Sequence, residues 1–145
     1  MADAQRLQEQ MMTLIRAFGL HQPDQTPCGQ PVGVSLAHAL MELERSAGLS
    51  QTELGSRLRL EKSTVCRLVT QLEQRGWVQR ERDPTDRRAV QLRLSEGGRE
   101  AAVQIAAARA EKFARIAAEI PEVEQESVWS ALDVLVNAMN RSKRE

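Results

Sequence analysis

The stretch GLSQTELGSRLRLEKSTVCRLVTQLEQRGWVQRERDPTDRRAVQLRLSEGG occupies residues 48–98 and decides the fold. Near its start, Ser50 and Glu53 have the spacing of a capping box, in which each side chain accepts a hydrogen bond from the other residue's backbone N–H. Leu49 and Leu54 flank this pair with the spacing of a hydrophobic staple. We therefore predict that a short helix begins here and spans residues 51–59.

A second helix is predicted over residues 62–75, after a turn near Leu60. Its apolar stripe recurs at steps of three and four residues and consists of Val65, Leu68, Val69 and Leu72. The rest of its N-terminal surface carries Lys62, Ser63, Thr64, Arg67 and Gln71. Such side chains hydrogen-bond phosphates and base edges, so this segment is predicted to be a recognition helix in a major groove. Cys66, beside the apolar stripe, is predicted to be a small packed residue.

The pattern changes from helical to alternating after Gly76. Residues 77–82 and 89–94 alternate as two strands, and a polar loop over residues 83–88 joins them. Arg87 and Arg88 at this loop suit a narrow minor groove, which concentrates negative potential. We expect Asp86 to hold one of these arginines through a bidentate pair. Two helices followed by an arginine-bearing hairpin predict a winged helix-turn-helix that binds double-stranded DNA.

The segments outside this stretch are predicted to be helical. Residues 3–19 carry a one-sided apolar stripe that ends at Gly19, and a Pro- and Gly-rich connector follows over residues 21–33. A supporting helix over residues 34–47 begins with Ser35 as a candidate N-cap. Ser95 is expected to cap a long helix over residues 96–119, and another helix follows Pro121.

The predicted architecture is mainly α with a small β-hairpin wing, in a single domain overall. Residues 1–33 form an N-terminal dimerisation helix and its connector, residues 34–98 the winged helix-turn-helix, and residues 99–145 the C-terminal dimerisation helices. The terminal helices carry more apolar surface than one small winged unit can cover. We therefore expect a homodimer.

Charge is concentrated in the predicted DNA-binding region. The 145-residue chain has a formal net charge of zero, but residues 57–93 contain ten basic and five acidic side chains, a local excess of five positive charges. This distribution is the electrostatic pattern of phosphate binding. Aromatic residues make up only 3% of the chain, which argues against a single-strand binder that stacks bases.

Other classes of protein are disfavoured by the same composition. No apolar run approaches the roughly 20 residues that span a bilayer, and the N-terminus lacks the pattern of a secretory signal. Two cysteines are too few for a disulfide framework, so we expect a cytoplasmic protein without a membrane partner. There is no phosphate-binding loop and no paired nucleophile and base, so neither an enzyme nor a cofactor is expected.

One group of residues suggests other chemistry. His38 and Glu42 are four residues apart on one predicted helix, and Cys28 lies in the preceding connector. Cysteine, histidine and carboxylate are ligands that suit Zn²⁺. No Cys-x-x-Cys or His-x-x-x-His pair accompanies them, so no metal site is assigned, and these three residues remain candidates for a metal-responsive or redox-responsive regulator.

Residues 60–98 resemble the MarR family of bacterial transcriptional regulators. The resemblance lies in three segments, namely Leu72-Glu73-Gln74-Arg75-Gly76, Asp86-Arg87-Arg88 and Leu94-Ser95-Glu96-Gly97-Gly98. It implies that Arg88 is the wing arginine of the minor groove, supported by Asp86, and that Ser63, Thr64 and Arg67 occupy recognition-helix positions. Glu61 departs from the Ser or Asp that more often caps this helix in the family.

The resemblance implies a dimeric regulator, most often a repressor, on a pseudo-palindromic duplex site and modulated by a small-molecule effector. Three alternatives remain open. The first is a regulator controlled by metal or cysteine chemistry at Cys28 and His38. The second is a winged-helix module for protein interactions without DNA binding, and the third is a weakly specific DNA-coating protein.

Overall fold

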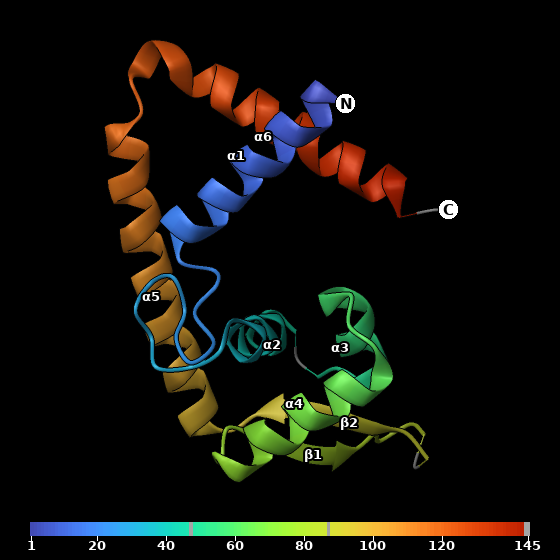
Figure 1. The fold of residues 1–145 in the computed structure, drawn as a ribbon. Coiled ribbons are helices and arrows are strands. Elements are labelled where there is room, and N and C mark those ends of the chain that lie inside the picture. Colours follow the sequence, from blue (N-terminus) through green and yellow to red (C-terminus); the bar gives the residue numbers. More distant parts are fainter. Residues whose placement is uncertain (47, 87, 144–145) are drawn as a thin grey trace. The chain divides into compact units, whose positions relative to one another are not determined.

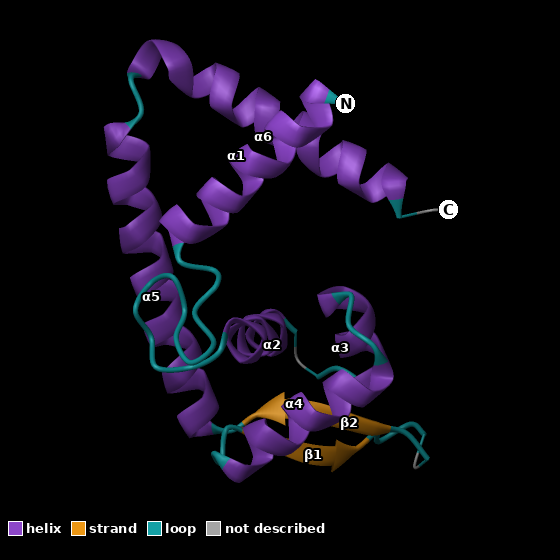
Figure 2. Ribbon diagram, viewed as in Figure 1, coloured by secondary structure: helices purple, strands orange, loops and turns teal. Residues whose placement is uncertain are grey.

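The structure is a computed structural model, and it describes residues 1–46, 48–86 and 88–143. Its elements, shown in Figures 1 and 2, are α1 (Ala2–Phe18), α2 (Val34–Arg45), α3 (Gln51–Leu58), α4 (Lys62–Gln74), β1 (Val78–Arg82), β2 (Val90–Leu94), α5 (Glu96–Glu119) and α6 (Glu122–Ser142). The chain divides into two compact units, residues 1–109 and 110–145. The mainly helical architecture with one small hairpin is the predicted one.

The core of the first unit lies where α2, α3 and α4 pack on one another and on the hairpin (Figure 1). Its largest fully buried side chains are Leu40, Leu49, Leu54, Leu72, Leu92, Val65 and Val69. Leu49 also pairs with β2, since the Leu92 N–H donates to the Leu49 carbonyl over 2.7 Å. The preceding Gly48 has φ 149°, a backbone conformation that L side chains rarely adopt, and it lies directly against the Gln91 side chain. The turn before α3 is thereby attached to the wing.

The start of α3 confirms the predicted cap, because the Ser50 Oγ accepts a hydrogen bond from the Glu53 N–H over 3.0 Å. The cap predicted for α2 is wrong. Gly33 is the N-cap there, without a side-chain hydrogen bond, and Ser35 already lies inside the helix. The described part of α2 ends at Arg45, and Ala47, the predicted last residue, lies outside the described residues.

The hairpin is antiparallel and runs from the pair Val78 and Leu94 to the pair Arg82 and Val90. Ser95 joins it to α5, since its Oγ donates to the Gly76 carbonyl over 2.5 Å and accepts from the Gly98 N–H over 3.1 Å. This confirms Ser95 as the cap of the predicted helix over residues 96–119. Gly98 packs on the backbone of Trp77, where an added Cβ would lie only 2.9 Å from the carbonyl carbon. A side chain at this position would push the wing away from α5.

Helices α1 and α6 contain no buried residue. Their large apolar side chains with substantial exposure include Leu7, Met12 and Leu14 on α1, and Trp129, Leu132, Val134, Val136 and Met139 on α6. Helices with this many large apolar side chains are normally covered by other parts of a folded protein or by a partner. Among the described residues, no helix combines the length and apolar character required to cross a membrane.

Candidate nucleic-acid interface

Helix α4 buries one face and exposes the other. Val65, Leu68, Val69 and Leu72 are buried against the core, as predicted. Of the predicted contact residues, Lys62, Ser63, Arg67 and Gln71 are exposed and Thr64 is half-buried. Positions 63, 67 and 71 are each four residues apart, so their side chains project from one side of the helix. The structure therefore brings three of the predicted recognition residues, Ser63, Arg67 and Gln71, onto one accessible side of the helix.

Two more residues belong to this surface. Cys66 is exposed, which corrects the expectation that it is packed, because position 66 faces away from the stripe formed by Val65, Val69 and Leu72. Thr70 is exposed one turn later, and its Oγ1 donates to the Cys66 carbonyl over 3.0 Å. A helical-wheel projection of residues 62–75 places positions 66 and 70 outside the apolar stripe, so the sequence alone could have identified both as exposed.

The start of α4 leaves backbone donors available. Glu61 is the N-cap, and its side chain makes no capping hydrogen bond. The first N–H groups of a helix have no partner within the helix and carry partial positive charge. In a helix whose exposed face bears Lys62 and Ser63, these N–H groups are suited to a phosphate oxygen.

The wing loop is organised by Asp83, a residue that the sequence analysis did not single out. The Asp83 Oδ1 accepts hydrogen bonds from the Thr85 N–H over 2.9 Å and from the Thr85 hydroxyl over 2.7 Å, and its Oδ2 accepts one from the Gln91 Nε2 over 3.2 Å. The backbone hydrogen bond from Thr85 is the first cause that lowers the pKa of the Asp83 carboxyl below its ordinary value. Aspartate two residues before threonine is a known turn-forming pattern and was a usable signal.

Asp86 contacts the backbone of the wing loop, and an ion pair with Arg87 would lie outside the described residues. Its carboxylate accepts a hydrogen bond from the backbone N–H of Arg88 over 3.0 Å, and its carbonyl accepts one from the Ala89 N–H over 3.0 Å. A short aspartate side chain reaches a backbone two residues ahead more readily than a guanidinium. Asp86 therefore shapes the loop, and the Arg88 side chain is exposed. The other predicted wing residue, Arg87, lies outside the described residues.

Several arginines of the basic segment are occupied by protein carboxylates. Arg80 Nη2 lies 2.8 Å from Glu73 Oε1, which joins β1 to the last turn of α4. Arg93 Nε lies 2.8 Å from Glu81 Oε2 across the hairpin. The positive surface available to a partner is therefore smaller than the count of basic residues indicates.

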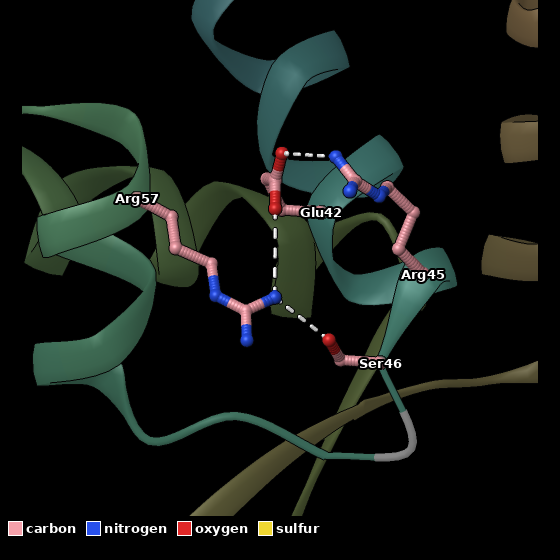
Figure 3. A network of polar contacts seen from close by, with 4 residues as sticks. All are labelled: Glu42, Arg45, Ser46 and Arg57. Atoms are coloured by element: carbon pink, nitrogen blue, oxygen red, sulfur yellow. Dashed lines mark hydrogen bonds and ion pairs between the residues drawn. The ribbon is translucent and has the colours of Figure 1, made fainter.

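A third arginine links α3 to α2, as Figure 3 shows. The Arg57 Nη1 donates to the Ser46 Oγ over 2.7 Å and lies 3.6 Å from Glu42 Oε2. The other carboxylate oxygen of Glu42 lies 3.4 Å from Arg45 Nη1. Glu42 thus lies between two guanidinium groups and serves to hold the two helices together.

The metal candidates are not brought together. Among the described residues, no group of three His, Cys, Asp or Glu side chains is placed to hold a metal ion. Cys28 is half-buried in the connector, and Glu42 is engaged with Arg45 and Arg57. Partial burial lowers the pKa of His38, the nearby charge of Arg109 lowers it further, and Glu42 opposes the change.

Comparison with known proteins gives the same architecture. Residues 34–90 match the sequence model of the MarR family. The chain is 43% identical over 60 residues to the HTH-type transcriptional regulator TtmR of Methylorubrum extorquens, covering 41% of this chain and 31% of that protein. It is 33% identical over 73 residues to the transcriptional repressor MprA of Escherichia coli, covering 49% and 42%. The chain thus spans less than half the length of these curated relatives.

Solved structures match over nearly the whole chain. A probable transcriptional regulator from Pseudomonas aeruginosa has a TM-score of 0.73 at 26% identity, covering 93% of this chain and 99% of that one. Streptococcus pneumoniae FabT, solved in complex with DNA, has a TM-score of 0.81 at 18% identity, covering 95% and 98%, and this likeness concerns the fold. The helix-turn-helix and most of the wing thus lie in the segment, residues 34–90, that is similar to the MarR family.

Proposed function

We propose that this protein is a homodimeric transcriptional regulator that binds duplex DNA and acts as a repressor. The observation that carries the proposal is the accessible face of α4, where Ser63, Arg67 and Gln71 project together beside an uncapped helix start. Arginine and glutamine at these positions match the donor and acceptor patterns of bases in the major groove. That TtmR is called a regulator and MprA a repressor supports the proposal.

The wing supplies a second contact in this proposal. Arg88 is exposed at the end of a loop that Asp83 and Asp86 hold through hydrogen bonds. A guanidinium presented from an ordered loop loses less conformational entropy on binding than one on a mobile loop. Arg88, together with its neighbour Arg87, is assigned to the minor groove or the backbone beside the site of α4.

The dimer is proposed from the apolar surfaces of α1 and α6, neither of which has a buried residue. Two copies would place two α4 helices in successive major grooves about 10 bp apart, on a pseudo-palindromic site. A small-molecule effector that changes the spacing of the two helices would then change affinity for this site. Localisation in the cytoplasm, where such DNA is accessible, belongs to the same proposal.

The experiment is selection of duplexes from a random library, followed by titration of the selected duplex with the wild-type protein and three variants. We expect Arg88→Ala to weaken binding to all duplexes. If Arg67 contacts a guanine, Arg67→Ala should reduce the discrimination between that guanine and other bases by about 1–3 kcal/mol. Arg115→Ala, on the exposed surface of α5, is the matched control and should bind as the wild type does.

Three outcomes would contradict the proposal. Absence of any salt-dependent duplex binding would favour a protein-interaction module. Nearly equal affinity for every duplex would favour a DNA-coating protein. Retention of full affinity by Arg88→Ala would remove the wing from the interface. The same titration with added Zn²⁺, and with Cys28→Ser after oxidation, tests control by metal or cysteine chemistry.

A further inference from the structure

A cavity of about 320 Å³ lies away from the exposed face of α4, where α2, β2 and α5 meet. Its wall includes the apolar side chains of Leu43 and Leu94, which belong to the end of α2 and the end of β2. Its polar lining contains an arginine from each of the three elements, namely Arg45 from α2, Arg93 from β2 and Arg99 from the first turns of α5.

The charge of this cavity is not balanced by its own lining. Glu44 is the acidic residue among the lining side chains, beside three guanidinium groups, and the carboxylates of Glu42 and Glu81 lie near Arg45 and Arg93 from outside the lining. The ion pair of Arg45 with Glu42 is long, since Arg45 Nη1 lies 3.4 Å from Glu42 Oε1. Arg99 takes part in no ion pair within the described ranges.

Arg93 provides a second and independent observation. Its Nε is shielded from solvent and has no hydrogen-bond acceptor among the described residues. Glu81 Oε2 lies 2.8 Å from this nitrogen, a distance that satisfies an ion pair, but the N–H is not directed at that oxygen. The Nε lies against Glu81 and is closed to solvent, so Arg93, whose side chain is 42% exposed, can offer a ligand only the N–H donors of its Nη groups.

The ligand class follows from these donors. Guanidinium groups bind carboxylate and phosphate oxygens with paired, charge-assisted hydrogen bonds. The cavity volume is at the small end of the range for ligand sites. We propose that this cavity binds a small dianion with carboxylate or phosphate oxygens, such as inorganic phosphate or a short dicarboxylate.

The position of the site gives the bound anion a structural effect. An anion held by Arg45, Arg93 and Arg99 connects three elements that contribute to the winged region. One of them, β2, begins at Val90, directly after the wing loop. The anion therefore restrains the strand that carries the wing, and this effect does not depend on whether the protein binds DNA.

Calorimetric titration of the full chain tests the proposal. Inorganic phosphate and succinate are titrated separately at constant ionic strength, with sodium chloride as the reference. We expect saturable binding of one dianion per chain, and the arm with the higher affinity identifies phosphate or dicarboxylate chemistry. Arg99→Gln should lower the affinity at least about tenfold, because it removes a charged donor. Arg99→Lys should retain part of it.

Arg115→Gln is the matched control, since it makes the same charge change on the same helix outside the cavity. The proposal is overturned if neither anion binds more than chloride does, or if the two glutamine variants lose affinity equally. Thermal unfolding of the wild type with phosphate against chloride gives a readout that needs no variant, and absence of any stabilisation also overturns the proposal. Duplex binding measured in parallel separates a failure of this site from a failure of the proposed function.

Discussion

The winged region and the helices α1 and α6 differ in how far their apolar side chains are buried. In the winged region, side chains from α2, α3, α4 and both strands form one buried cluster. Helices α1 and α6 contain no fully buried residue, although both carry large apolar residues. The first region buries its apolar surface within one chain, whereas the proposed dimer would cover that of α1 and α6 by a contact between chains.

This difference separates two kinds of stability. A region that holds its own core unfolds with a free energy that does not depend on protein concentration. Helices whose apolar faces are covered only by a partner are stabilised by mass action and become more stable as concentration rises. The two kinds of stability therefore respond differently to point substitutions.

Shortening one leucine in each region, a buried one and an exposed one, compares the two regions directly. Leu40 is fully buried, so Leu40→Ala should lower the free energy of unfolding by about 2–5 kcal/mol at every protein concentration. Leu132 on α6 is 43% exposed, and Leu132→Ala should instead weaken self-association. Urea unfolding and analytical ultracentrifugation over a range of concentrations measure both. A concentration-independent loss in Leu132→Ala would show that α6 belongs to the core of one chain.

The contact between the wing and α5 is tested at two adjacent glycines. Gly98→Ala should cost about 1–3 kcal/mol of unfolding free energy, because its Cβ meets the Trp77 backbone, which cannot move without displacing β1. Gly97→Ala is the matched control, since an added Cβ there would lie 3.8 Å from the nearest heavy atom, the Gly76 carbonyl oxygen, and alanine favours a helix. Equal unfolding midpoints for the two variants would contradict the close contact.

The helix starts of the winged region provide a smaller test. Ser50→Ala removes the acceptor for the Glu53 N–H and should cost about 1 kcal/mol. Ser35→Ala should have almost no effect, because Ser35 lies inside α2 and does not cap it. Chemical denaturation of both variants distinguishes them. A larger loss in Ser35→Ala than in Ser50→Ala would restore the cap that the sequence predicted.

The smallest expected effect is a pH dependence from His38. Its pKa in the folded chain is below the ordinary value of 6.5, so folding favours the neutral ring. The unfolded chain therefore takes up a proton first as pH falls through 6.5, and stability decreases until the folded-state pKa is passed. Thermal unfolding at pH 7.5 and 5.5 should show a smaller decrease in His38→Gln than in the wild type. His21→Gln, at the other histidine of the chain, is the control.

Local patterns in the sequence predicted much of the fold. The pair Ser50 and Glu53 marked the start of α3, and Ser95 marked the start of α5, because capping depends on residues a few positions apart. The apolar stripe of α4 was also correct, since helical periodicity alone determines which positions face the core. The wrong cap at Ser35 came from the same kind of reasoning, applied where Gly33 already provides the turn into α2.

The parts of the site that sequence reasoning missed depend on contacts between distant positions. The count of basic residues treated Arg80 and Arg93 as available, but pairing with Glu73 and Glu81 appears only once the hairpin and α4 are placed together. The arginine-lined cavity likewise joins residues 45, 93 and 99, which share no pattern along the chain. Tertiary packing, rather than local preference, decides such contacts.

The ion pair between Arg80 and Glu73 has a consequence for counterion release. Each phosphate that a protein neutralises displaces condensed cations from DNA, and the slope of log affinity against log salt concentration counts these contacts. An arginine that already holds a carboxylate of its own chain adds little to that slope. For a duplex-binding protein with this fold, Arg80, Arg93 and Arg57 should therefore be nearly silent in a salt titration. The slope of log affinity against log salt concentration would then reflect only the phosphate contacts made by the wing and α4.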